Sequence, residues 1–118
     1  MCVPGCTVDE CFEGRPPIQR EIYERLLAHL ATLGPVHIDA VRVGIFLKTD
    51  RKLAEVRPKA RSLSLELVLP RAMAHPRVVR TITIAADRVA HVVKLPGLDD
   101  VDDEVREMLT QAYNHATD

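Results

Sequence analysis

The apolar residues of this chain change their spacing twice, and these changes limit the folds that the chain can adopt. From Ile18 to Leu33 they recur every three or four residues, which is typical of an amphipathic helix. Between residues 41 and 95 they alternate with polar residues, which predicts strands. A helical spacing returns between Val101 and Tyr113. Helix, strands and helix in this order predict an α+β fold with an antiparallel sheet.

Local signals set the expected ends of these elements. Pro16 and Pro17 suit the start of the first helix, and Gly34 followed by Pro35 suits its end. We expect the second helix after residue 97, with Asp99 or Asp100 as its cap. Five segments predict a meander of about five strands: 41–48, 53–57, 63–69, 78–85 and 88–95.

One apolar face on each helix predicts that both helices cover the same face of the sheet, leaving the other face open to solvent. At 118 residues, a single domain is expected, and we assign it to residues 12–118. Residues 1–11 are expected to form a cysteine-containing N-terminal tail. The sequence has neither a secretory signal nor an apolar stretch long enough to cross a membrane, so a cytoplasmic protein without membrane contact is expected.

The charged residues are sorted by segment. Residues 42–94 carry twelve Lys or Arg side chains against four acids, whereas acids predominate in residues 1–41 and 95–118. The net charge of −1 therefore hides a basic centre between acidic ends. Such a centre can attract anions or orient a partner. We expect an anionic partner, with nucleic acid as one candidate.

Strand alternation predicts where the basic side chains point. If Val41, Val43, Ile45 and Leu47 face the helices, Arg42 and Lys48 point to the open face. The last strand places Lys94 on that face by the same argument. Segment 69–77 is expected to be the binding loop. Its basic residues are Arg71, His75 and Arg77, and Arg80 follows at the start of the next strand. The alternative is a solvated turn whose arginines pair with acids of a neighbouring helix.

His91 is expected to face the core, because it alternates with apolar residues. It is a candidate for partner or ligand binding, and the alternative is a core histidine hydrogen-bonded to a carbonyl or carboxylate. No nucleophile elbow, glycine-rich phosphate loop or His-Glu metal motif occurs, so we expect no catalysis. The chain has only four aromatic residues, so no base-stacking platform is expected.

The three cysteines, Cys2, Cys6 and Cys11, all lie near the N-terminus. Their odd number argues against a disulfide framework. Their spacing is weak for structural zinc, which takes four ligands as two close pairs. We therefore expect no cofactor, with zinc at these thiols as the alternative.

Several motifs occur in the order found in one known family. They are residues 7–17, 22–26, 34–36, 69–71, 75–77, the strand of His91, 99–102 and 112–113. Because of these motifs, the chain resembles the uncharacterised bacterial domain-of-unknown-function family 5655 over residues 7–114. The resemblance implies a small α+β unit that stands alone, follows a Cys-rich zinc-binding-like stretch or is joined to a nuclease-like domain. It implies no activity, and relatives often have His in place of Cys11.

Two functions remain open. The first is a non-catalytic accessory binding module that contacts an anionic partner through its basic sheet face and loop. The second is an assembly domain that forms a homodimer through complementary basic and acidic surfaces.

Overall fold

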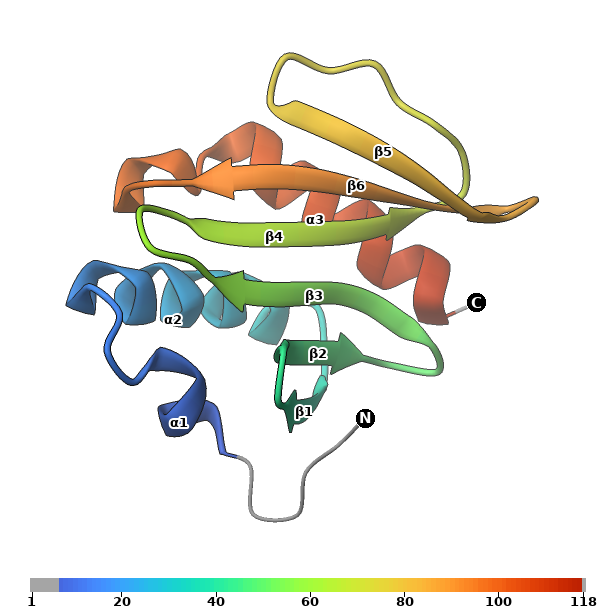
Figure 1. Cartoon of the computed structure of the whole chain (residues 1–118). Coiled ribbons are helices and arrows are strands. Elements are labelled where there is room, and N and C mark those ends of the chain that lie inside the picture. Colours follow the sequence, from blue (N-terminus) through green and yellow to red (C-terminus); the bar gives the residue numbers. More distant parts are fainter. Residues whose placement is uncertain (1–6, 118) are drawn as a thin grey trace.

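A computed structural model describes residues 7–117 and shows helices packed on one side of an open sheet (Figure 1). The sheet has six strands, all antiparallel, in the order β1-β2-β3-β4-β6-β5. The helices are α1 (Val8–Phe12), α2 (Pro17–Ala31), the 3-10 helix η1 (Leu98–Asp100) and α3 (Asp103–Thr117). The strands are β1 (His37–Val41), β2 (Gly44–Lys48), β3 (Lys52–Pro58), β4 (Leu63–Leu69), β5 (Val78–Ala85) and β6 (Arg88–Leu95).

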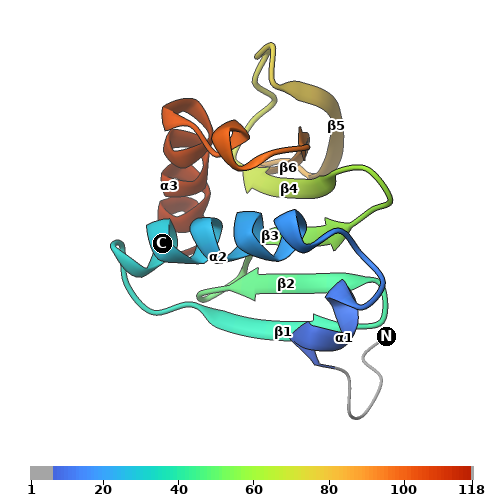
Figure 2. The ribbon, with the colours of Figure 1, turned by 90° about the vertical axis from the view of Figure 1, so that its left-hand side faces the viewer.

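Helices α2 and α3 lie on the same face of the sheet, as Figure 2 shows, which confirms the predicted α+β arrangement. Their apolar stripes are buried, with Leu26 and Leu109 completely inaccessible. On the sheet they meet the alternate residues of the central strands, among them Leu65 and Val93, which pair directly across β4 and β6. Burial of this alternating set fixes the strand register, since a slip of one residue would turn it to solvent.

The opposite face of the sheet is the open face. Its residues include Phe46 on β2, Glu55 on β3, Ser64 on β4, and Val92 and Lys94 on β6. This face has no helix over its centre, although Glu55 and Val92 on it are buried.

The first predicted strand is in fact two strands. β1 and β2 form a hairpin with a two-residue turn, in which Arg42 and Val43 are exposed. Arg42 therefore lies at the end of the sheet, and the expected register of residues 41–48 was wrong for this residue and for Val43. The hairpin leaves Gly44 close to β3, where a Cβ would lie 2.6 Å from the carbonyl oxygen of Val56.

The strand order also departs from a simple meander. β6 inserts between β4 and β5, so that loop 70–77 runs back along the molecule and β5 becomes an edge strand (Figure 1). A smaller correction concerns α3. Its cap is Asp102, whose Oδ1 accepts a hydrogen bond from the Val105 amide at 3.0 Å, while Asp99 and Asp100 belong to η1.

The N-terminal segment contains one element that periodicity did not predict. Helix α1 begins at Val8, within the segment assigned to the tail, and Thr7 caps it by accepting a hydrogen bond from the Glu10 amide. Residues 1–6, which include Cys2 and Cys6, lie outside the described residues. Between residues 7 and 117, no helix has both the length and the apolar character needed to cross a membrane.

Candidate anion-binding site

Four basic side chains from distant parts of the sequence line one hollow at the edge of the open face. They belong to Lys59 and Arg61 in the β3–β4 connection, Arg80 on β5 and Lys94 on β6. The hollow has a volume of about 620 Å³. We call it the cationic hollow, and its remaining lining residues are Ala60, Ser62, Ser64, Val79 and Val92.

Strand pairing brings these residues together. Ser64 pairs with Lys94 across β4 and β6, and Arg80 pairs with Val92 across β5 and β6. Paired residues in antiparallel strands project to the same face. The side chains of these two pairs are therefore neighbours on the open face. A register shift between Val78 and Arg80 marks a bulge, which kinks β5 beside the hollow.

The β3–β4 connection is held in place from the helix side. Gln19 of α2 is almost completely buried, and its Nε2 donates a hydrogen bond of 2.6 Å to the carbonyl oxygen of Lys59. The Lys59 amide in turn donates to the carbonyl oxygen of Ser62 at 3.1 Å, which closes the turn. The backbone that carries Lys59 and Arg61 is therefore fixed by the fold, while their side chains are free to extend.

Among the residues that the structure describes, none of the four cations of the hollow forms an ion pair. Arginine offers forked donors that match phosphate or carboxylate oxygens, and the hydroxyls of Ser62 and Ser64 add neutral donors. The hollow is chemically suited to an anion with several oxygen atoms.

The other half of the open face is electrostatically balanced. Lys48 pairs with Asp39 at 3.3 Å, and Lys52 lies 2.9 Å from Glu55 and 3.6 Å from Glu66. Arg57 pairs with Glu55 as well. The predicted basic residue Lys48 therefore belongs to a network of paired charges rather than to the cationic hollow.

Glu55 pairs with both Lys52 and Arg57 and is only 2% exposed. Burial disfavours its charged form, but the hydrogen bonds and positive charges of Lys52 and Arg57 outweigh burial and lower the pKa of Glu55. Lys52 also lies over the Phe46 ring, 4.7 Å from its centroid. The carboxylate thus holds two cations in fixed positions and keeps them from acting as free anion contacts.

Loop 70–77 is tied to the start of α3 by two of the predicted binding residues. His75 Nε2 lies 2.8 Å from a carboxylate oxygen of Glu104. Arg77 pairs with Asp102 and donates a hydrogen bond of 2.9 Å to the Asp100 carbonyl oxygen. The Val105 amide is the largest influence that lowers the pKa of Asp102, and Arg77 lowers it further against the opposing effect of burial.

The remaining predicted residues are dispersed. Arg71 is exposed in loop 70–77, and Arg42 is exposed at the β1–β2 turn. His91 is completely buried: its Nε2 accepts a hydrogen bond from the Met73 amide at 2.9 Å, and its Nδ1 lies 2.9 Å from the Val89 carbonyl oxygen. These bonds fix the neutral tautomer with the proton on Nδ1 and anchor the loop to β6.

Of the residues predicted from the sequence, only Arg80 and Lys94 line the cationic hollow. Sequence reasoning missed the contribution of Lys59, Arg61, Ser62 and Ser64. The sequence signal that could have indicated them is the pair Lys59 and Arg61 in the short connection before the alternating strand that begins at Leu63. Assigning them to the site requires the pairing of β4 with β6, which is not a local property.

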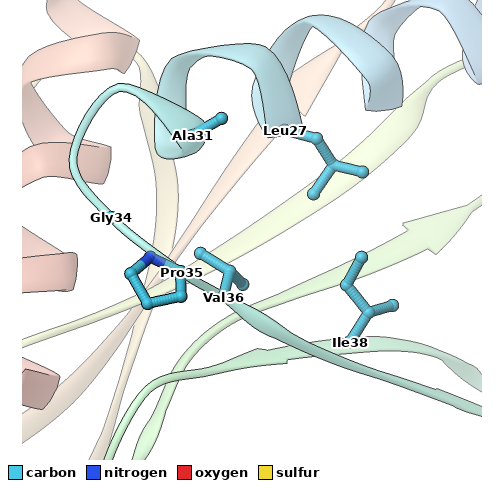
Figure 3. A pocket seen from close by; sticks show the side chains of 6 residues that line it. All are labelled: Leu27, Ala31, Gly34, Pro35, Val36 and Ile38. Carbon is cyan, nitrogen blue, oxygen red and sulfur yellow. The ribbon is translucent and has the colours of Figure 1, made fainter.

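A second hollow is apolar and lies between α2 and β1. Figure 3 shows Leu27 pointing into the space above Val36 and Ile38, and the hollow has a volume of about 520 Å³. No charged or hydroxyl-bearing side chain lines it. It therefore offers apolar contact without the polar groups that orient a specific ligand.

The described residues contain no group of three or more His, Cys, Asp or Glu side chains placed to hold a metal ion. Cys11, the one cysteine among them, is half-buried in α1, with its Sγ 3.6 Å from the Val41 carbonyl oxygen.

The structure is that of a small α+β domain with two principal helices on one face of an open antiparallel sheet, and the cationic hollow lies on the other face. The chain belongs to the DUF5655 family, described as a domain of unknown function, whose sequence model matches residues 8–116. Neither the curated proteins nor the solved structures contain a match to the chain.

Proposed function

We propose that this domain is a non-catalytic binding module that contacts an anionic partner through the cationic hollow, with the phosphates of nucleic acid as the anion. The observation that carries this proposal is the grouping of four cations without ion-pair partners in the described chain, beside a half-sheet whose cations are paired.

Stability of the fold gives no reason for this grouping. Two like charges about 4 Å apart repel by about 1 kcal/mol even in water, and more near a protein surface. Other cations of the molecule are matched with acids, as in Arg77 with Asp102 and Lys48 with Asp39. An anion bound between Arg61, Arg80 and Lys94 would reverse the repulsion and use their donors at once.

Charge reversal tests this proposal. Labelled nucleic acids are titrated with the purified domain at low and near-physiological salt, and binding is followed by fluorescence anisotropy. We expect salt-sensitive binding that weakens at least tenfold in the variant Arg61→Glu/Arg80→Glu. The matched control Arg42→Glu/Arg71→Glu changes the net charge equally but lies outside the hollow, and we expect less than a threefold effect. Equal losses in both variants would assign binding to the overall field and remove the hollow from the proposal.

The second candidate is a homodimer formed through complementary charges. Exposed acids of α3, such as Glu107, favour it because they can meet the cationic hollow of another copy. They lie on the helix side of the sheet, so this contact joins different surfaces of the two copies and is heterologous, which leaves one surface of each kind free to bind further copies. Light scattering coupled to gel filtration tests it: the assembly should form in low salt and dissociate in high salt, whereas a monomer in both excludes it.

A further inference from the structure

The positions of all four aromatic rings restrict the kind of nucleic acid that the cationic hollow can bind. Phe12 and Tyr23 pack against each other with centroids 5.3 Å apart, and Tyr113 is only 8% exposed. Phe46 is half-buried, and the ammonium groups of Lys48 and Lys52 lie over its ring. These are the four rings of the chain, and none lines the hollow.

Proteins that hold single strands usually combine a positive groove with rings on which successive bases stack. Without such rings, a single strand would be held by its phosphates alone and would have to be ordered without that compensation. A duplex already has its bases stacked and its phosphates in fixed positions. It also presents one charge per about 1.7 Å of axis, compared with one per about 3.4 Å along each strand.

The unpaired cations extend along β6 in a way that suits a rigid phosphate array. Arg88 has no ion-pair partner in the described residues and begins the open-face row that continues through Ala90 and Val92 to Lys94. Six residue-to-residue steps of extended strand separate Arg88 and Lys94 by about 20 Å. Measured along the axis of a duplex, that span equals the rise of about six nucleotide steps of one strand. Ala90 and Val92 between them are buried, at 1% and 8% exposed, so Arg88 and Lys94 supply the charged contacts at the two ends of the row.

We propose that the ligand of the cationic hollow is a duplex nucleic acid, bound through its phosphates without base readout. This inference rests on the proposed function of the hollow. Its contacts are the four cations of the hollow, with Arg88 as a fifth at the other end of β6.

The test compares one labelled 16-base-pair DNA duplex, its two separated strands, an RNA duplex of the same sequence and a second DNA duplex of shuffled sequence. We expect a duplex to bind at least tenfold more tightly than either separated strand, and the two DNA sequences to differ by less than threefold. The DNA and RNA arms distinguish the two sources of duplex phosphates. The plot of log affinity against log salt should have a slope of about −3.6 to −4.5, for four or five phosphates.

Single substitutions then locate the contacts. Arg80→Ala and Arg88→Ala should each make the salt slope shallower by about one, whereas Arg42→Ala should leave it unchanged. Equal or tighter binding of single strands, lost in Arg61→Glu/Arg80→Glu, would overturn the duplex inference while the proposed function stands. A tenfold preference between the two DNA sequences would overturn it as well. No binding of any nucleic acid at low salt would overturn both.

Discussion

Glu55 shows how one buried carboxylate organises half of the open face. Because the pKa of Glu55 is lowered in the folded state, ionised Glu55 stabilises the fold above its unfolded pKa, and this contribution is lost as pH falls through the folded value. We predict that Glu55→Gln costs about 2 kcal/mol at pH 7, since the cations of Lys52 and Arg57 lose a charged partner. The difference from the natural protein should shrink as pH falls below the ordinary value of 4.5.

Urea unfolding at several pH values measures this difference. The exposed residue Glu21 provides the control, and Glu21→Gln should change stability at pH 7 by less than about 0.5 kcal/mol. A Glu55→Gln penalty that stays constant down to low pH would show that shape, and not charge, makes the contribution.

His91 acts on loop 70–77 through one hydrogen bond to the Met73 amide. His91→Leu leaves that amide and the Val89 carbonyl oxygen without their partner, so we predict a loss of about 1–3 kcal/mol. Amide hydrogen exchange should accelerate at Met73 more than at the paired strand residue Leu65. Unchanged protection of Met73 would mean that the loop is held by its ion pairs with α3 alone.

At the scale of elements, the junction between α2 and β1 depends on one glycine. Gly34 has φ of +150°, and a Cβ there would lie 2.4 Å from the Tyr113 hydroxyl, which bonds the Pro35 carbonyl oxygen. We predict that Gly34→Ala costs about 2 kcal/mol or more by combining backbone strain with this clash. Gly14→Ala is the control, because Gly14 has φ of +76° but nothing within 4 Å of the Cβ position.

A double-mutant cycle separates the two causes. Tyr113→Phe removes the clashing oxygen, so Gly34→Ala should cost less in that background, as thermal unfolding of the four proteins would show. An identical cost in both backgrounds would attribute the whole effect to backbone strain.

The elements also show which features were predictable from local sequence. β4, β5 and β6 have the predicted bounds because alternation and turn residues act within each strand. The Arg42–Val43 turn was missed because Val41, Val43 and Ile45 continue the alternation through it. The cationic hollow depends on β6 pairing with β4, and the Arg77–Asp102 pair joins residues 25 positions apart. Such contacts are decided by packing of the whole chain.

At the scale of the whole molecule, β5 is an edge strand with apolar side chains that are exposed to solvent. Val79, Ile82 and Ile84 on this strand are each at least 42% exposed. Exposed apolar edge strands pair with other chains unless bulges or charges interrupt them. Register shifts lie near both ends of β5, and Arg80 is its one charged residue, which leaves Thr81 to Thr83 as the regular, uncharged segment.

We therefore predict that self-association at high concentration proceeds through β5. Ile82→Lys should suppress it, because the charge would be placed in the middle of the regular segment. The matched control is Ile38→Lys: Ile38 is 41% exposed on the opposite edge strand β1, against 42% for Ile82. Both changes should alter stability by less than about 0.5 kcal/mol. Static light scattering near pH 6.5, where net charge is smallest, measures the effect. Equal suppression by both variants would show that added charge, and not the β5 edge, controls association.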